Sequence, residues 1–494
     1  MTISPDRDDF STIFHVLGRI IVGLSLCLVL PFLIAIFYKE VSAFYDFSLA
    51  ISFSAILGIS LMMIFPLKKE ISRIHTFFIV SLGWLIASLL GAVPLYLSSH
   101  YLGFLDAWFE AMSGFATTGL TLVRDLDHLS FSHNMWRHLM MFIGGQGIIL
   151  ASISLLFHAK GPVLGLYIGE ARTEKILPNI IATSRFIWKV SIIYLITGVF
   201  ILTIFLSHKG MSLDRAFLHG LWIFFASFDT GGFAPQAQNI VYYHSLNLEF
   251  ITIILMMLGA INFNLHFWIW FKDKREIFKN FEIRTFMVSF FLLLFMLFFS
   301  LRGLSHFSIF RKGFYQLISA HTGCGFTNLA FGELKGISSL SLLAIIFAMM
   351  IGGGVCSTTG GVKLMRLGLV FKSFFMEIRR LMMPFKAVYK DSYHHLEDKM
   401  IDDKRIKEIF IFCSLFLVTY LIGAIIGIFL GYPLLASLFE SVSATANVGL
   451  SLGITHPSMP AVLKVVYILQ MWIGRLEFLA VFVMLGFIFS LFKK

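Results

Sequence analysis

Long apolar segments alternate with short polar connections along almost the whole chain. Each segment approaches or exceeds the roughly 20 residues that a helix needs to cross the hydrocarbon core of a bilayer. The pattern predicts ten transmembrane spans, at residues 12–37, 47–66, 75–98, 133–157, 186–207, 247–271, 285–301, 338–376, 405–430 and 460–491. The sequence therefore predicts an all-α integral membrane protein.

Composition supports the same class of protein. Hydrophobic residues make up 58% of the 494-residue chain and charged residues 14%, well below the roughly one quarter typical of soluble domains. The net charge is +11, but the basic residues lie in short loops between apolar segments and not on one soluble face, so we expect membrane lipid and no nucleic acid as partner. Four scattered cysteines without a CxxC pair argue against a disulfide framework or a zinc site.

The basic loops predict the orientation of the chain. Lys and Arg concentrate in alternate connections, which are residues 66–75, 160–185, 271–284 and 379–407, and again at the C-terminus. The opposite connections are poorer in basic residues, although Arg302, Arg311 and Lys312 lie there. Because positive loops stay on the cytoplasmic side, both termini are predicted to be cytoplasmic, which agrees with an even number of spans.

A semi-apolar segment, too short to cross a bilayer, recurs in each of four non-cytoplasmic connections. The four segments are 104–121, 213–234, 310–328 and 434–451, and their ends read ATTGL, DTGGF, TGCGF and ANVGL. Aligning these ends places one glycine of each segment in step, at Gly119, Gly232, Gly325 and Gly449. The order of span, re-entrant helix, glycine-bearing return and span therefore repeats four times.

This repetition predicts the organisation of the chain. A pair of transmembrane helices occupies residues 1–70, and four tandem helix–pore-helix–helix repeats follow around a pseudo-fourfold pore. The repeats are expected at residues 71–160, 161–275, 276–400 and 401–494. The second helix of the third repeat is broken by residues 352–363, GGGVCSTTGGVK. Backbone freed by such a break is tolerated in a membrane only against protein or a water-filled cavity, so the break indicates a cavity.

The glycine-bearing returns predict a cation filter. A helix that ends in mid-membrane points the partial negative charge of its C-terminus at the axis, and carbonyls of an extended return can replace the water shell of an ion. A lone glycine is more often a tight turn or a packing contact, but four in register favour a pore. The candidate filter residues are Thr117, Thr118, Gly119, Thr230, Gly231, Gly232, Thr322, Gly323, Cys324, Gly325, Asn447, Val448 and Gly449.

Several motifs together resemble the Trk/Ktr/HKT superfamily of K⁺ transporters. FEAMSGFATTG (109–119) resembles the first pore helix and filter of that family, GGQGIIL (144–150) the start of its next span, and GRLEF (474–478) the arginine motif of its last helix. The resemblance covers about residues 70–490, and the two additional spans before the first repeat are similar to the Trk-type subunit. Two filter segments depart from the family pattern, DTGGF and the Cys324-bearing TGCGF, which affects the expected selectivity among K⁺, Rb⁺ and Na⁺.

The resemblance implies a function and partners. It implies K⁺ as the transported ion, a homodimer with one pore per subunit, and a cytoplasmic nucleotide-binding regulatory subunit that is TrkA-like. The expected location is the bacterial cytoplasmic (inner) membrane. No HExxH, GxSxG, GxGxxG or Walker A motif occurs, so we expect no enzyme activity and no organic cofactor in this chain. Coupled K⁺/H⁺ or K⁺/Na⁺ symport is the alternative, although four repeats of one direction favour a channel-like path over inverted repeats.

By the same resemblance, residues 352–363 form an intramembrane gating loop beneath the filter. The alternative is a kinked helix that packs closely through its small residues. Arg475, in the middle of the last span, could hold the carbonyls of this loop or pair with a carboxylate to join helices. The candidate gate residues are Gly352, Gly353, Gly354, Ser357, Thr358, Thr359, Gly360, Gly361, Lys363 and Arg475.

Other ionisable residues lie close to the predicted filter. Glu110 and Glu440, on pore helices, are expected to brace the filter from behind, whereas Asp229 could face the outer mouth or brace. His133 and His138 are five residues apart and not four, which argues against a helical metal pair, and we expect them to be ordinary loop residues.

Overall fold

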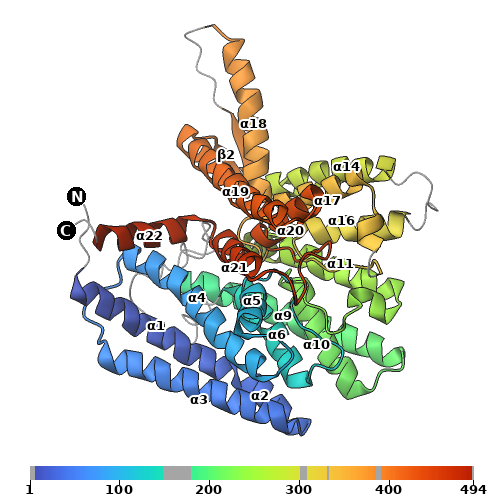
Figure 1. Ribbon diagram of the computed structural model, residues 1–494. Helices are drawn as coiled ribbons and strands as arrows, with labels where there is room; N and C mark the ends of the chain where they lie inside the picture. Colours follow the sequence, from blue (N-terminus) through green and yellow to red (C-terminus); the bar gives the residue numbers. More distant parts are fainter. Residues whose placement is uncertain (1–5, 148–179, 301–308, 331–332, 385–390, 492–494) are drawn as a thin grey trace.

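The computed structural model describes residues 6–147, 180–300, 309–330, 333–384 and 391–491 (Figure 1). These residues form an almost entirely helical fold, as predicted. The departure from an all-α fold is an antiparallel hairpin of β1 (Ser392–His395) and β2 (Glu397–Met400), in which Ser392 pairs with Met400.

Six helical segments of the described chain are long and apolar enough to cross a membrane. They correspond to six of the ten predicted spans. The first is formed by α1 (Arg7–Cys27) with α2 (Val29–Phe37), and the others are α3 (Val41–Ile64), α4 (Arg73–Leu97), α9 (Ile180–His208), α14 (Phe281–Ser300) and α19 (Asp403–Phe429).

Two predicted spans, 247–271 and 460–491, are bent helix pairs and not straight helices. The helices α11 (Leu246–Ala260) and α12 (Phe263–Phe271) meet at 99°, and α21 (Ala461–Arg475) and α22 (Leu479–Leu491) meet at 107°. The second bend has a local cause. Glu477 and Phe478 adopt φ values of 51° and 67°, in a left-handed region that ends an α-helix.

Of the two remaining predicted spans, one is interrupted and the other is described only in part. Span 338–376 becomes α17 (Ser339–Ile351), the non-helical residues 352–363, and α18 (Leu364–Leu381). The prediction of a single broken span was wrong for its second half, because α18 is amphipathic, ends in Arg379 and Arg380, and projects from the body of the molecule (Figure 1). Span 133–157 begins as α6 (Phe131–Gln146), and its part beyond residue 147 lies outside the described residues.

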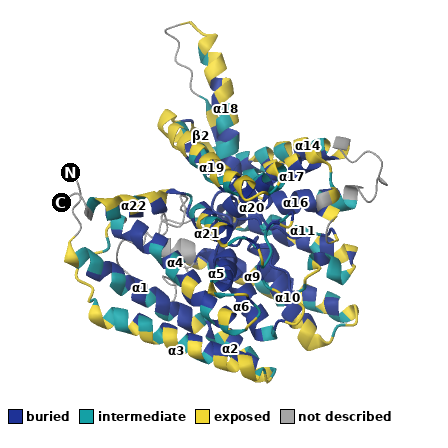
Figure 2. Cartoon of the chain, viewed as in Figure 1, coloured by how far each residue is buried: buried dark blue, intermediate teal, exposed yellow. Residues whose placement is uncertain are grey.

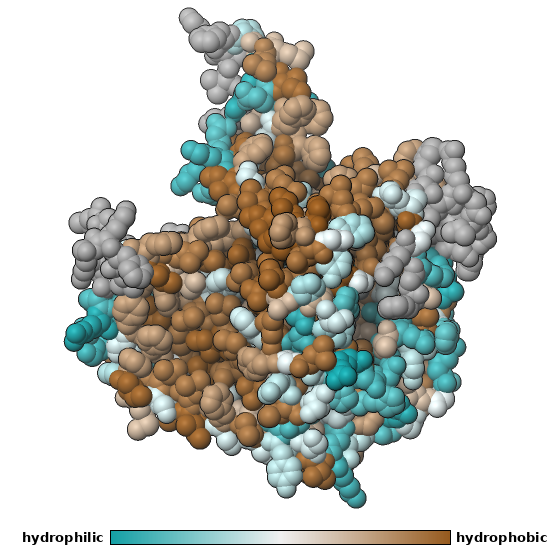
Figure 3. Space-filling view, in the orientation of Figure 1, coloured by the Kyte–Doolittle hydropathy of each residue, from teal (hydrophilic) through white to brown (hydrophobic). Residues whose placement is uncertain are grey.

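Four short helices that do not cross the molecule converge on its centre. They are α5 (Phe104–Phe115), α10 (Leu213–Phe228), α16 (Phe314–His321), which follows a π-helical turn at Ile309–Gly313, and α20 (Leu434–Thr445). Their final turns are buried, and this region is the dark blue centre of Figure 2. The long helices surround them, and many of their apolar side chains point outward (Figure 3). Outward apolar side chains on such long helices suit contact with lipid.

The buried side chains divide into two clusters. The larger fills the space around the four short helices. The smaller cluster joins α18, the β-hairpin and α19 to two residues of the glycine-rich stretch, Val355 and Cys356. The rest of the smaller cluster is Met365, Leu369, Met376, Tyr393, Ile401 and Ile409.

The β-hairpin is attached to the short helix α13 (Glu276–Lys279) by ionic hydrogen bonds. His394 lies between two carboxylates, with Nδ1 2.8 Å from Asp398 Oδ1 and Nε2 3.1 Å from Glu276 Oε2, and the amide of Leu396 donates to Glu276 Oε1 at 3.1 Å. An imidazole that donates to two carboxylates must carry both ring protons. The two carboxylates raise the pKa of His394 above its ordinary value.

This geometry makes hairpin stability depend on pH. Because the folded-state pKa of His394 is raised, its contribution is complete below about pH 6.5 and is lost as pH rises through the raised value. We expect the amide protection factor of residues 392–400, corrected for intrinsic exchange, to fall about fivefold between mildly acidic and mildly alkaline pH. Hydrogen–deuterium exchange of the wild type and of His394→Gln measures this. An equal pH dependence in the variant would contradict it.

Candidate functional site

The four glycine-bearing returns share one backbone conformation. In each, the first and third of three consecutive residues have positive φ. The triplets are Thr117–Gly119, Thr230–Gly232, Gly323–Gly325 and Asn447–Gly449. In each, the middle amide donates to a carbonyl five residues earlier in the short helix, at 2.8–2.9 Å. The predicted filter residue Thr322 lies one position outside this register, and its hydroxyl bonds back to Ile318 O at 2.8 Å.

The four triplets form a closed ring. A Cβ built on the glycine that ends each triplet would lie less than 3.0 Å from a main-chain oxygen of the next triplet. Gly119 faces Gly231 O, Gly232 faces Cys324 O, Gly325 faces Val448 O, and Gly449 faces Thr118 O. The order therefore runs from the first repeat to the fourth and back to the first. Since real Cβ atoms essentially never approach so closely, glycine is required at all four positions.

Two buried glutamates brace the ring from behind, as expected. Glu110 accepts from Thr121 Oγ1 at 3.0 Å, from the amide of Leu122 at 2.8 Å and from Arg137 Nε at 2.8 Å. Glu440 accepts from the hydroxyl of Thr455 at 2.7 Å. It also accepts from Ser451 and from the amides of Leu452 and Ile454. In the third repeat Gln316, at the same position relative to the glycine, accepts from Thr327 Oγ1 at 3.0 Å.

The second repeat has Ile223 at this position, and helix α6 of the first repeat holds its return segment. His138 lies 3.1 Å from Phe233 O, Asn134 donates to Pro235 O at 3.1 Å, and Arg137 donates to Ala234 O at 3.4 Å. The expectation that His133 and His138 are loop residues was therefore wrong, because both are buried on α6. The sequence reading also missed Arg137, although a charge inside a predicted span marks it in the same way as Arg475.

Asp229 does not face an outer mouth. It caps the C-terminal end of α10, is fully buried, and accepts from Gln146 Nε2 at the end of α6 at 2.9 Å. Its carboxylate also contacts Gly145, where an added Cβ would lie less than 3.0 Å from it. Asp229 therefore lies behind the filter segment, against the helix of the preceding repeat.

The glycine-rich residues 352–363 pack against the inner ends of the short helices. Thr358 Oγ1 lies 3.1 Å from Phe228 O and 3.1 Å from Thr230 Oγ1. A Cβ on Gly360 would lie less than 3.0 Å from Ala446 O in the fourth repeat. Side chains and neighbouring repeats satisfy much of the backbone of the stretch, including the amide of Gly353 on Thr359 Oγ1 at 3.1 Å and that of Gly354 on Ala260 O at 2.9 Å. The stretch is thus an ordered loop and not a kinked helix.

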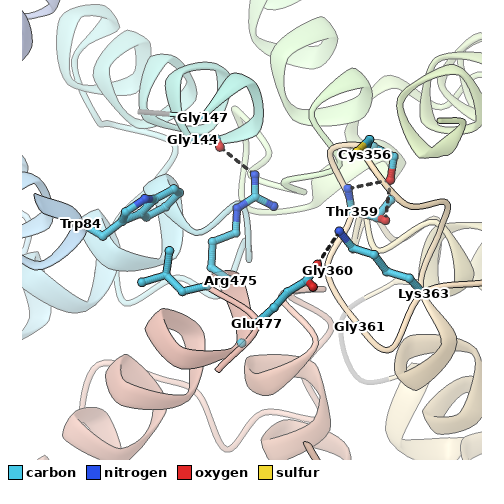
Figure 4. A pocket seen from close by; sticks show the side chains of 13 residues that line it. Trp84, Gly144, Gly147, Cys356, Thr359, Gly360, Gly361, Lys363, Arg475 and Glu477 are labelled. Carbon is cyan, nitrogen blue, oxygen red and sulfur yellow. Dashed lines mark hydrogen bonds and ion pairs between the residues drawn. The ribbon is translucent and has the colours of Figure 1, made fainter. Parts of the chain in front are cut away.

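Arg475 joins this loop to the first repeat. Its Nη1 donates to Thr358 O and its Nη2 to Gly144 O, both at 2.7 Å, and its guanidinium lies 5.8 Å from the ring centre of Trp84. Glu477, at the bend after α21, forms ion pairs with Lys363 at 2.7 Å and with Arg366. Figure 4 shows Arg475 reaching toward Gly144 while Lys363 and Glu477 meet at the other side of the loop.

A small cavity separates these groups. Its walls are formed by Trp84, Gly144, Gly147, Cys356, Ser357, Thr359, Gly360, Gly361, Lys363, Gly474, Arg475, Leu476 and Glu477. The space open to the centre of a water-sized sphere is about 30 Å³, which is room for roughly two water molecules. The loop and Arg475 therefore leave little open space between them.

The chemistry of the ring suits a monovalent cation held by main-chain oxygens. Its donors are carbonyl groups, which can replace the hydration shell of an ion. Among the described residues, no group of three or more His, Cys, Asp or Glu side chains could hold a metal ion.

Comparison with known proteins agrees with this architecture. An uncharacterized cation transporter of Methanocaldococcus jannaschii is 34% identical over 97% of this chain and 96% of its own length. The Trk system potassium uptake protein TrkH of Escherichia coli is 28% identical over 95% of this chain and 96% of its own. The crystal structure of the potassium transporter TrkH from Vibrio parahaemolyticus superposes with a TM-score of 0.81, at 24% identity, over 96% of this chain and 98% of that one, which establishes the fold.

The match to a family is equally extensive. Residues 44–488, from the third helix almost to the end of the last, match the TrkH family, described as cation transport protein. This multi-pass membrane protein therefore belongs to the TrkH family.

Proposed function

We propose that this chain takes up K⁺ through a single-chain, channel-like pore. The observation that carries the proposal is the closed ring of four triplets, in which the glycine of each repeat faces a main-chain oxygen of the next repeat. Such a ring supplies a pseudo-fourfold set of carbonyls of the kind that selects K⁺. TrkG and TrkH of Escherichia coli are named potassium uptake proteins, which supports the same substrate here.

In this proposal residues 352–363 and Arg475 are the gate. In this proposal the loop lies on the inner side of the ring. The guanidinium of Arg475 then adds a positive charge on the path of a cation. The arginine also holds the loop in place through Thr358 O. Displacing the loop would remove both obstacles together.

The proposal includes the organisation and orientation of the chain. The first pair of transmembrane helices occupies 1–70, and the four repeats occupy 71–160, 161–275, 276–400 and 401–494. Phe10, near the start of α1, packs on Phe487, near the end of α22, with ring centres 5.8 Å apart. The first and last described helices therefore meet on one side, and in this proposal that side is the cytoplasmic face of a bacterial inner membrane, which the basic loops support.

Two assembly partners belong to the same proposal. A second copy of the chain would cover the apolar stripe of α18, where Phe371, Phe374 and Phe375 are each more than half exposed. A nucleotide-binding, TrkA-like regulatory subunit would dock on the cytoplasmic face, whose basic loop 379–407 is described in part; loop 160–185 lies largely outside the described residues.

Uptake by coupled symport with H⁺ or Na⁺ is the alternative. Rb⁺ uptake into vesicles with imposed proton or sodium gradients tests it. Under the channel-like proposal uptake follows the Rb⁺ gradient and the membrane potential alone. Uptake driven against the electrochemical gradient of Rb⁺ would establish coupling.

The ring makes selectivity depend on its glycines. Gly232→Ala and Gly325→Ala are each expected to lower the preference for Rb⁺ over Na⁺ by about tenfold or more, because a Cβ must displace the carbonyl of the next repeat. Paired Rb⁺ and Na⁺ fluxes in proteoliposomes measure the change. Gly336→Ala is the matched control, since nothing lies within 4 Å of the added Cβ among the described atoms. Unchanged selectivity in all four single glycine variants would refute the filter.

Removing the anchor of the gate should open the pore. Arg475→Ala deletes two charge-assisted hydrogen bonds, each worth roughly 1.5–3 kcal/mol, together with the positive charge. We expect it to raise Rb⁺ flux by about tenfold or more, and deletion of residues 355–357 to act in the same direction. Vesicles that contain the chain alone are the assay. Well-folded variants whose flux is unchanged or lower in both cases would instead support a structural role for loop and arginine.

The apolar stripe of α18 should be needed for dimerisation. Replacing Phe371, Phe374 and Phe375 together by Ser removes apolar area worth about 1 kcal/mol or more per ring. We expect the dimer dissociation constant in detergent to rise about a hundredfold, measured by light scattering across a dilution series. Lys372→Ser, on the same helix, is the control for loss of a side chain. A dimer unaffected by the triple change would place the interface elsewhere.

A further inference from the structure

Thr358 is a residue of the gating loop whose side chain bonds to a filter residue. Its hydroxyl lies 3.1 Å from Phe228 O, 3.0 Å from Gly259 O and 3.1 Å from the hydroxyl of Thr230. Its amide also donates to Gly259 O at 3.3 Å. Both threonines are fully buried, so these bonds are not exchanged for bonds to bulk water.

The partners of Thr358 are functional parts of the second repeat. Phe228 O belongs to the last turn of the short helix α10, and Thr230 is the first residue of the filter triplet, with φ of 51°. A positive φ is uncommon for a residue with a side chain and persists only where the surroundings hold it. Thr230 can donate its hydroxyl proton to Thr358, which in turn donates to a carbonyl, so one chain of bonds runs from the filter to the helix end.

The other repeats meet the loop differently. In the fourth repeat the contact is steric, between Gly360 and Ala446 O, and in the first repeat it is indirect, through Arg475 on Gly144 O. In the third repeat, a Cβ on Gly323 would lie 3.8 Å from Thr359 Cβ, an ordinary packing distance. The direct side-chain bond between loop and filter residue is thus the one made by Thr358 to the second repeat.

We propose that Thr358 is a positioning residue for the second filter segment, so that ion preference depends on where the gating loop lies. With the loop in place, the Thr358 hydroxyl orients Thr230 and the end of α10. When the loop moves away, these bonds break and the second segment loses that support. By reciprocity, ions that favour the ordered segment also favour the seated loop. This inference rests on the proposed filter and gate.

Substitution of Thr358 by Val tests the inference, because Val keeps the shape and removes the hydroxyl. We expect Thr358→Val to lower the preference for Rb⁺ over Na⁺ about fivefold, the ratio that corresponds to one ordinary hydrogen bond. Thr358→Ser keeps the hydroxyl and is expected to restore most of the preference. Ser357→Ala removes a neighbouring hydroxyl that bonds to Gly354 O and Thr359 inside the loop and not to the second repeat, and is expected to change the ratio less than Thr358→Val does.

The outcomes are distinct. Higher flux with unchanged selectivity in Thr358→Val would overturn the inference and leave Thr358 as part of a gate alone. Thr230→Val removes the same bond from the filter side and replaces Thr358→Val in the test if that variant does not fold. Normal selectivity in Thr230→Val would also overturn the inference. In Thr230→Val/Thr358→Val the two effects should not add, since both delete one bond. Gly232→Ala in the same assay reports on the filter itself, so failure of the filter is distinguished from failure of the coupling.

Discussion

The close approach of four main-chain segments is the constraint on which the rest of the structure depends. Each ring glycine faces a carbonyl oxygen of the next repeat at a distance that excludes a side chain. Asn447 Nδ2 donates to Thr118 Oγ1 across the ring at 3.1 Å, but segments so close leave little room for side chains between them, so their positions are held mainly from behind. The buried pair of Glu110 and Arg137, the bonds of Glu440, and the polar face of α6 supply that support. Losing one partner of such a buried pair leaves an uncompensated charge, which is strongly destabilising.

A second requirement follows from the broken helix. A loop inside the molecule must satisfy its own backbone groups, and residues 352–363 do so partly on other repeats: the amides of Gly354 and Thr358 donate to Ala260 O and Gly259 O, and Thr358 O accepts from Arg475. The resulting contacts are specific yet involve little apolar burial between loop and filter. Polar contacts of this kind hold one geometry while each costs little to break, which suits a segment proposed to move.

The sequence predicted the parts of this structure that repeat. Hydrophobic length located the long helices, and the alignment of four glycines located the ring, because both depend on local pattern. The sequence did not predict the contacts in which a side chain of one repeat binds another repeat. In the third segment the predicted filter residues included Thr322 in addition to the triplet Gly323–Gly325, since a Thr before the glycine is plausible there until the backbone is seen. Asp229 was left open because its partner, Gln146, lies 83 positions away. The bends after Ala260 and Arg475 carry no Pro, and the direction of α18 depends on packing with the hairpin and α19.

Because the buried side chains form two clusters, the loop connects two separately packed parts of the molecule. Val355 and Cys356 are packed with α18, the hairpin and α19, whereas Thr358, two residues later, is bonded to the filter. Separate apolar clusters behave as separate cooperative units, each able to shift or open without dissolving the other. A pull on the smaller cluster would therefore reach the loop through side-chain packing and meet the four triplets at a few hydrogen bonds.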